Sequence, residues 1–213
     1  MYDGSAAARL YKRERDMLLF LRGSGLVPRL THFCDDQPFL ITQWIPQTLD
    51  EMCLDLWGCD GLGYRLGDWC ARYDEAAPSR PERGTRLDYA MAMTPTLPIE
   101  KVEGAAAGLA SIPLCGSSLA HNDAALENNL YDAKLGILRC DFARSAFRPR
   151  GWDYIFTRHA VTERFPAHRK DILDAMSEGF EAAHRGSLRV DELDHLSDIF
   201  VALFAVMGDG HGN

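Results

Sequence analysis

A short polar segment near the middle of the chain places oxygen-bearing side chains at the spacing that phosphoryl transfer uses. Asp123 and Asn128 belong to a stretch of the form H-x-D-x-x-x-x-N that begins at His121. Asp141 follows at the end of an apolar run. In this arrangement one aspartate takes a proton from a hydroxyl, while an asparagine and a second aspartate hold Mg²⁺ on the phosphates of ATP.

The role predicted for each side chain follows from its chemistry. Asp123 lies in a loop between a predicted helix and a predicted strand, where a general base can reach a substrate hydroxyl. Asn128 offers a neutral oxygen and Asp141 a charged one, which suits Mg²⁺, a hard ion that keeps water and phosphate among its ligands. His121 is expected to hold the loop by hydrogen bonds. Loops also favour Asp and Asn for their turn geometry, so the joint pattern carries the prediction.

Helices and strands must position this segment, and hydrophobic periodicity with turn signals predicts where they lie. The predicted helices cover residues 5–22, 49–56, 64–77, 99–109, 169–184 and 191–207. The predicted strands cover residues 32–34, 39–45, 130–131 and 137–140. Residues 78–98, which are rich in proline, are expected to form an irregular connection. This order predicts an α+β fold with a boundary near Pro46, which separates residues 1–46 from residues 47–213.

Composition limits the classes of partner. The chain has 213 residues and 46% hydrophobic content, which suits one globular unit of one or two lobes. Its net charge of −8 disfavours nucleic acid and anionic membranes as partners. The longest apolar run, 199–207, is too short for a membrane span, which needs ~20 residues. The six cysteines lack zinc-ligand spacing and predict reduced thiols in a cytoplasmic protein.

The loop and the strand end resemble the aminoglycoside phosphotransferase and choline kinase family of the protein-kinase-like superfamily. That family carries H-G-D-x-x-x-x-N and then [I/V]-D-[W/F]; here Asn122 replaces the usual Gly, and Asn tolerates unusual backbone angles. The resemblance implies that Asp123 is the base and that Asn128 and Asp141 hold Mg²⁺. It implies ATP as phosphate donor and a small-molecule hydroxyl as acceptor. Asp153 resembles the aspartate that supports the catalytic loop, although a carboxylate at a helix N-terminus is the alternative interpretation.

The resemblance extends to the first part of the chain. Residues 13–21 resemble the family's R-E-x-x-x-L-x-x-L helix, which implies that Glu14 is the carboxylate that pairs with a strand lysine. The strand that follows ends in Gln43, Trp44 and Ile45, and the backbone of this connector would bind adenine. The implied fold is protein-kinase-like, with an incomplete N-lobe of one helix and two strands and a mostly helical C-lobe with a small β insert.

The glycine-rich hairpin and the lysine that grip the phosphates in this fold have no counterpart in the sequence. Both precede the Glu14 helix in the family, and Lys12 lies two residues from Glu14, where side chains of one helix point apart. We therefore expect a chain that starts after the lysine and turns over weakly or not at all, because this chemistry depends on positioning and charge. The missing neighbours should also leave a free strand edge that favours a homodimer.

Three hypotheses remain open at this point. The first is an ATP-dependent phosphotransferase that acts on a small-molecule hydroxyl, and the second is a catalytically silent, pseudokinase-like binding module. A RIO-like protein kinase is less favoured, because no A-P-E activation segment is recognisable. Arg144, Arg148 and Arg150 could contact phosphate or belong to a solvated loop. Acceptor choice is expected to lie within residues 50–98, and the sequence does not name the acceptor.

Overall fold

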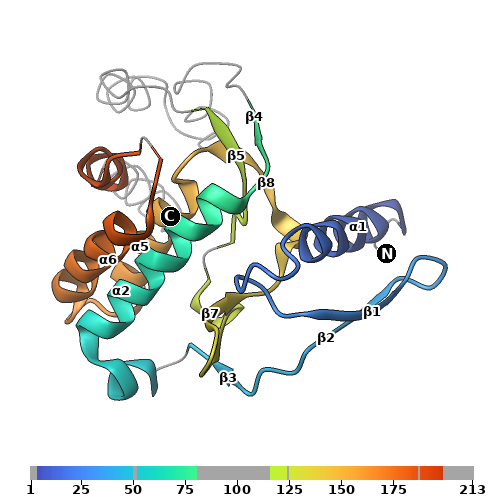
Figure 1. Ribbon diagram of the computed structural model, residues 1–213, viewed down its shortest axis with the longest axis horizontal. Coiled ribbons are helices and arrows are strands. Elements are labelled where there is room, and N and C mark those ends of the chain that lie inside the picture. The colour runs from blue at the N-terminus through green and yellow to red at the C-terminus, as the bar shows by residue number, and fades with distance from the viewer. Residues whose placement is uncertain (1–3, 50–51, 81–115, 124, 187, 199–213) are drawn as a thin grey trace, which may run out of the picture.

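The computed structural model describes the chain except for residues 1–3, 50–51, 81–115, 124, 187 and 199–213 (Figure 1). Its helices are α1 (Gly4–Phe20), α2 (Met52–Ala76), α5 (Trp152–Arg164) and α6 (Arg169–Ala183), with 3-10 turns η1 (Leu126–Asn128) and η2 (Phe142–Arg144). Its strands are β1 (Leu30–Cys34), β2 (Phe39–Thr42), β3 (Gln47–Thr48), β4 (Ser79–Arg80), β5 (Ser117–Ala120), β6 (Asn129–Asp132), β7 (Gly136–Arg139) and β8 (Ala146–Pro149). Residues 190–198 are also helical. The predicted helix over 99–109 lies outside the described residues.

The first part of the chain forms a helix that packs beside a two-stranded antiparallel hairpin (Figure 1). The hairpin is where the sequence predicts it, with Cys34 opposite Phe39. The Tyr11 hydroxyl donates a hydrogen bond of 2.8 Å to the Cys34 carbonyl, which fixes α1 against β1. The second strand is shorter than predicted and ends at Thr42, because the chain then turns away from β1. The Gln43 N–H donates to the Arg29 carbonyl at this turn.

Two small three-stranded sheets carry the middle of the chain. One has the order β3-β6-β7 and the other the order β4-β5-β8, and all pairs are antiparallel. The strands β6 and β7 were predicted. The strands β3, β4, β5 and β8 were not, because each has two to four residues and is defined by a partner distant in sequence. The β3 strand joins the connector after the hairpin to β6, with Gln47 opposite Tyr131.

Helices α2 and α6 pack against each other at unusually short distance. Gly63 and Gly67 on α2 face the backbone of α6, where an added Cβ would lie 2.1 Å from the Ile172 carbonyl oxygen or 2.0 Å from that of Met176. Two predicted helices correspond to α2, which is kinked at Gly58 with φ 66°. The helix α5 was not predicted, because several of its polar side chains are buried and weaken the alternation of polar and apolar faces.

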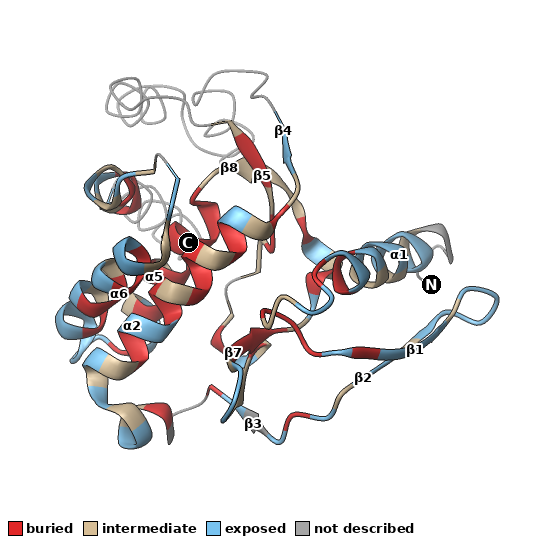
Figure 2. Ribbon diagram, viewed as in Figure 1, coloured by how far each residue is buried: buried red, intermediate tan, exposed pale blue. Residues whose placement is uncertain are grey.

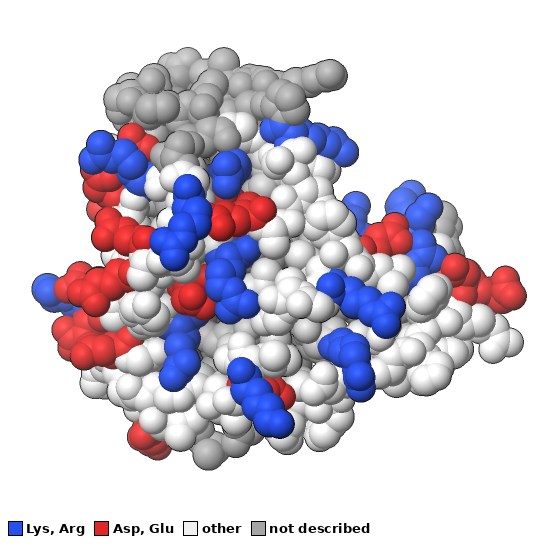
Figure 3. Space-filling model, in the orientation of Figure 1, with Lys and Arg blue, Asp and Glu red and all other residues white. Residues whose placement is uncertain are grey.

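The main core lies between α2, α5 and α6 and extends to the small sheets and α1 (Figure 2). Trp69, Trp152 and Phe180 are among its largest fully buried side chains. In the face drawn in Figure 3, acidic groups gather at the left and at the far right, and basic groups are spread across its middle. Among the described helices, none is both long and apolar enough to cross a membrane.

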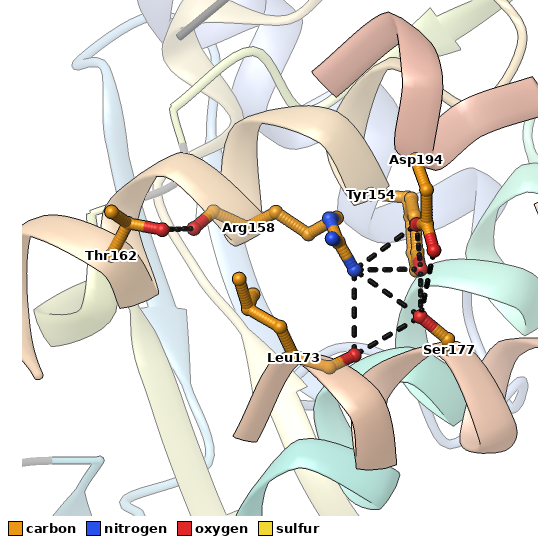
Figure 4. Close-up of polar contacts among 6 residues, drawn as sticks. All are labelled: Tyr154, Arg158, Thr162, Leu173, Ser177 and Asp194. Atoms are coloured by element: carbon orange, nitrogen blue, oxygen red, sulfur yellow. Dashed lines mark hydrogen bonds and ion pairs between the residues drawn. The ribbon is translucent and has the colours of Figure 1, made fainter. Parts of the chain in front are cut away.

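A polar network joins α5, α6 and the helix of residues 190–198 (Figure 4). Arg158 Nη1 lies 3.0 Å from Asp194 Oδ1, and the Tyr154 hydroxyl donates to the same oxygen at 2.8 Å. The Ser177 hydroxyl donates to Asp194 Oδ2 at 3.1 Å. Because Arg158 and Tyr154 are buried, these contacts compensate for the lost hydration of the charged groups and fix the helices relative to each other.

Candidate functional site

One carboxylate of α5, that of Asp153, holds the backbone of the loop that begins at His121. Asp153 accepts hydrogen bonds from the backbone N–H groups of His121, at 2.8 Å, and of Asn122, at 3.1 Å. Its side chain is buried, and burial raises its pKa, while the charge of Arg139 and the two N–H groups oppose that rise. These are the contacts expected of a residue that supports the loop, and they use both carboxylate oxygens.

The His121 ring connects this loop to the end of β7. Its Nε2–H donates to the Cys140 carbonyl at 2.8 Å, since a carbonyl can only accept. The ring is fully buried. Burial, followed by the positive charge of Arg139, lowers the pKa of His121 to about 4. The imidazole is therefore neutral near pH 7, and its position suits a structural contact better than proton transfer.

Backbone hydrogen bonds place Asn128 next to the residue that precedes Asp141. The Cys140 N–H donates to the Asn128 carbonyl at 3.0 Å, and the Cys140 thiol lies 3.4 Å from the same oxygen. The two predicted metal ligands are therefore carried on adjacent, hydrogen-bonded segments. The Asp141 side chain is exposed and makes no hydrogen bond that caps η2.

Unusual backbone conformation coincides with the candidate site. Among the described residues, Asn122 (φ 62°) and Asp141 (φ 63°) are the only residues other than glycine with positive φ. Such conformations cost of order 1 kcal/mol and occur preferentially at functional sites. Asn and Asp adopt them more readily than most residues, so Asn122 and Asp141 hold these conformations with little strain.

The carboxylate of Asp123 has few partners. Its Oδ1 accepts the Ala125 N–H at 3.3 Å, and its Oδ2 lies 3.8 Å from Arg144 Nε. The Arg144 side chain is 73% exposed, so this ion pair contributes little to the energy of the site. Asp123 is thus a largely uncommitted, partly exposed oxygen donor, as a general base requires.

Asn122 makes contacts that the sequence did not indicate. Its Oδ1 accepts from Arg148 Nε at 3.0 Å and from Trp152 Nε1 at 3.2 Å. Its Nδ2 donates to the Arg144 carbonyl at 3.2 Å. One amide therefore joins the loop to β8, α5 and η2. Arg148 is thereby engaged within the fold, which leaves Arg144 as the exposed member of the predicted arginine group.

The third arginine of that group is also structural. Arg150 donates to Asp74 Oδ2 from Nε at 3.0 Å and from Nη2 at 2.7 Å. Asp74 is buried and also accepts the Gly151 N–H at 3.0 Å. These bonds fix the start of α5, the helix that carries Asp153. Arg150 is therefore not available as a phosphate contact.

A fully buried arginine lies beneath the site. Arg139 donates from Nε to Asn129 Oδ1 and from Nη2 to Thr157 Oγ1, each at 2.6 Å. Its guanidinium lies 4.2 Å from the centre of the Trp69 ring. The sequence offered one signal for this residue, which is an arginine inside the apolar run that leads to Asp141. Its charge lowers the pKa of His121 and opposes the raised pKa of Asp153.

Glu14 lies against the turn that contains Asp141. The backbone N–H groups of Asp141, Phe142 and Ala143 face its carboxylate and favour the charged form, but burial and then the charge of Asp141 raise its pKa to about 7. Its Oε2 is buried and has no hydrogen-bond partner among the described residues. The predicted helix carboxylate is therefore inside the site, and no lysine of the described chain pairs with it.

Replacing Glu14 by Gln should stabilise the protein more at pH 8 than at pH 5. The folded pKa of about 7 exceeds the unfolded value of about 4.3, so folding favours the protonated form. Stability is therefore lost as the pH rises from about 4 through about 7, and a neutral Gln avoids that loss. We expect a gain of about 2 kcal/mol above pH 7. Urea unfolding at both pH values measures it.

The matched control for this measurement is Glu181→Gln, which removes an exposed carboxylate of α6. It should leave the unfolding free energy nearly unchanged at both pH values. An equal effect of Glu14→Gln at pH 5 and pH 8 would show that the Glu14 carboxyl ionises as it does in the unfolded chain.

The three residues of the connector predicted to bind adenine differ in how far they are exposed. Ile45 is buried, Trp44 is 84% exposed, and Gln43 is half-buried. The Gln43 N–H is already bonded to the Arg29 carbonyl at 2.8 Å. Within the described residues the backbone N–H groups of Trp44 and Ile45 have no hydrogen-bond partner, so both remain available to bind the edge of an adenine ring.

The donor set fits Mg²⁺ better than a softer metal. Among the described residues, no three His, Cys, Asp or Glu side chains gather in a way that could enclose a metal ion. Asn128 and Asp141 supply one amide oxygen and one carboxylate, neither of which is bonded to another described residue through its side chain. Mg²⁺ usually takes one or two protein oxygens and fills its remaining positions with water and phosphate.

Comparisons with known proteins agree on the fold. No protein-family model and no curated protein sequence matches the chain. A choline/ethanolamine kinase family protein from Mesorhizobium loti matches with a TM-score of 0.59 at 18% identity, over 95% of this chain and 71% of that one. The amicoumacin kinase hAmiN, solved with AMP-PNP, Ca²⁺ and Ami, matches with a TM-score of 0.61 at 12% identity, over 91% and 69%.

A third solved structure gives the same result. The macrolide 2'-phosphotransferase MphH from Brachybacterium faecium matches with a TM-score of 0.57 at 15% identity, over 98% of this chain and 77% of that one. These likenesses confirm the predicted protein-kinase-like α+β fold, in which the described first part holds one helix and one hairpin.

Proposed function

We propose that this protein is an ATP-dependent phosphotransferase that transfers the γ-phosphate to a hydroxyl of a small molecule. The observation that carries the proposal is the hydrogen-bonded junction between the loop at His121 and the turn at Asp141, with a left-handed residue on each side. The matched structures add support, because their names describe kinases and phosphotransferases of small molecules, one of them with AMP-PNP bound.

Each side chain of the site would have a different role in the reaction. Asp123 would accept the proton of the attacking hydroxyl, and its sparse partners leave it free to do so. Asn128 and Asp141 would hold Mg²⁺, which when bound neutralises charge on the phosphates. Neutral His121 and buried Asp153 would keep the loop in place. Catalysis in this scheme rests on position and charge, since phosphoryl transfer needs little else from a protein.

Replacing Asp123 by Asn should reduce phosphoryl transfer about a hundredfold or more, because the amide cannot accept the hydroxyl proton. The measurement is transfer of labelled γ-phosphate from Mg·ATP to a panel of amino-sugar, macrolide and amino-alcohol acceptors. The control is Asp36→Asn, which changes an exposed aspartate of the hairpin turn by the same atoms. Measurable turnover by the wild type that the Asp123→Asn variant retains in full would contradict the assigned role.

The second candidate is a module that binds nucleotide and does not turn it over. It is favoured by Glu14, whose buried Oε2 has no cationic partner among the described residues. A lysine that paired with Glu14 would orient the phosphates of ATP. Mg·ATP that raises the melting temperature without any phosphate transfer or release would select this candidate over the first.

We also propose that two copies associate through the hairpin in the cytoplasm. Phe33, Phe39 and Ile41 are each about half exposed on the hairpin (45%, 46% and 50%). Among the described residues no further strand pairs with either outer edge of the hairpin, so an edge can accept a strand of a second copy. No disulfide joins the five described cysteines, in keeping with a reducing compartment. Light scattering should show a mass that rises with concentration, and Ile41→Lys should lower it to that of a monomer. A wild-type monomer at all concentrations would refute this association.

A further inference from the structure

A cavity of about 850 Å³ opens between the turn after α1, α2 and the β6–β7 turn. Its walls include the backbone of the Gly23–Gly25 turn, and its polar lining is dominated by cations. The charged residues that line it are Arg22, Arg29, Arg72 and Lys134. No aspartate or glutamate lines it.

Most of these cations lack an acidic partner. Within the described residues the side chains of Arg22, Arg29 and Lys134 make no ion pair and no hydrogen bond to protein groups. Arg72 is the exception: its Nη1 lies 3.3 Å from Asp68 Oδ2, and its Nη2 donates to the Ser24 carbonyl at 3.2 Å. The local excess of positive charge is therefore largely uncompensated by the protein itself.

The turn that forms the wall of the cavity is held rigidly. The Leu26 carbonyl accepts two hydrogen bonds of 3.0 Å, from Trp69 Nε1 of α2 and from the backbone N–H of Arg139. The Ser24 hydroxyl accepts the Leu26 N–H at 3.1 Å, and Gly25 adopts φ 73°, which glycine allows at little cost. A ligand would therefore meet cations whose backbone supports are already ordered, which reduces the entropy lost on binding.

The charge of this region contrasts with that of the whole chain. The protein carries a net charge of −8, which repels anions at long range. Figure 3 nevertheless shows basic side chains along the middle of one face, between the helical part and the hairpin. The cavity lies apart from the predicted catalytic and metal-binding residues, because Glu14, Asp123, Asn128 and Asp141 are not among its lining residues. It shares Gln43 with the predicted adenine-binding connector, while Trp44 and Ile45 do not line it.

We propose that this cavity binds a small anion with several negative charges, of the phosphate-ester or polyphosphate class. Guanidinium groups match phosphate oxygens in geometry, and Lys134 adds a mobile point charge from the β6–β7 turn. Gln43 is half-buried and also lines the cavity, and its side-chain amide can donate a hydrogen bond to a phosphate oxygen. The volume exceeds that of inorganic phosphate, so a polyphosphate or a larger phosphate ester fits better. The site does not depend on the proposed phosphotransferase activity.

The experiment is isothermal titration of the full chain with tripolyphosphate, without divalent metal and at about 0.15 M salt, where exposed charges are well screened. Wild type should bind one equivalent. Arg29→Gln and Lys134→Gln should each weaken binding about tenfold, and the double variant Arg22→Gln/Arg29→Gln more than either, because each loses a charge-assisted hydrogen bond. These side chains are exposed, so melting temperatures should stay close to that of wild type.

Two controls locate the site. Arg169→Gln removes an exposed arginine of α6 with the same change in net charge and should bind as wild type does. Asp141→Asn should also bind metal-free tripolyphosphate as wild type does, which separates this cavity from the candidate active site. Absence of saturable binding by wild type, or an equal loss in Arg169→Gln, would overturn the proposal.

Discussion

Replacing Asp141 by Asn should weaken Mg²⁺-dependent binding of ATP about a hundredfold or more. Changes in groups that merely orient a metal ligand cost up to about a hundredfold in metal affinity, so loss of the ligand's own charge should cost at least as much. Asn adopts the left-handed conformation of residue 141 (φ 63°) as readily as Asp does, so the backbone of the turn should be preserved. The change therefore tests the charge of the carboxylate and not the fold of the turn.

The measurement is titration with ATP in the presence and absence of Mg²⁺, compared with Asp36→Asn as a control of equal charge change on the exposed hairpin turn. A second observable does not involve ATP. The charge of Asp141 raises the pKa of Glu14, so the Asp141→Asn variant should show a lower Glu14 pKa in an NMR titration. If ATP affinity keeps its dependence on Mg²⁺ while the Glu14 pKa falls, the metal lies elsewhere and the geometry of the turn is still correct.

Replacing Gly67 by Ala should lower the free energy of unfolding by about 3 kcal/mol, although alanine is the better helix former. The added Cβ would lie 2.0 Å from the Met176 carbonyl oxygen and 2.8 Å from the Phe180 nitrogen, which are rigid backbone atoms of α6. The helices would have to separate, and the packing of a core that includes Trp69 would loosen with them.

Urea unfolding followed by circular dichroism measures this change. Gly61→Ala in the same helix is the comparison, because the nearest atoms to its added Cβ belong to the Trp57 side chain of α2 itself, at 2.8 Å, and none belongs to α6. Its effect should be markedly smaller. A Gly67→Ala variant within about 1 kcal/mol of wild type would mean that α2 and α6 are further apart in solution.

Local patterns in the sequence were sufficient for several elements. The apolar pairs on either side of Asp132 predicted β6 and β7, and the turn at 35–38 predicted the hairpin, because both are built from neighbours in sequence. The strand predicted over residues 39–45 was too long, because β2 ends at Thr42, where the chain leaves β1. The short strands β3, β4, β5 and β8 depend on partners far along the chain, which periodicity does not reveal.

The candidate site shows the same division. The residue types at 121, 123, 128 and 141 carried the chemistry, because a base and an oxygen-donor pair are recognisable from spacing. The contacts of Asn122 with three other elements could not be inferred, since Arg148 and Trp152 become its neighbours only after the chain folds. Arg150 illustrates the opposite case: its sequence position left a phosphate contact or a solvated loop open, and its partner Asp74 in α2 makes it structural.

The sequence by itself determined which groups could react and which local elements carry them, because residue type and spacing fix chemistry and short-range hydrogen bonding. Tertiary structure decided the environment of each group. It placed Glu14, half-buried, beside Asp141, buried Arg139 beneath the loop, and gathered Arg22, Arg29 and Lys134 around one cavity. The physical reason is that desolvation and charge–charge interactions act through space, and the distances on which they depend exist only in the folded chain.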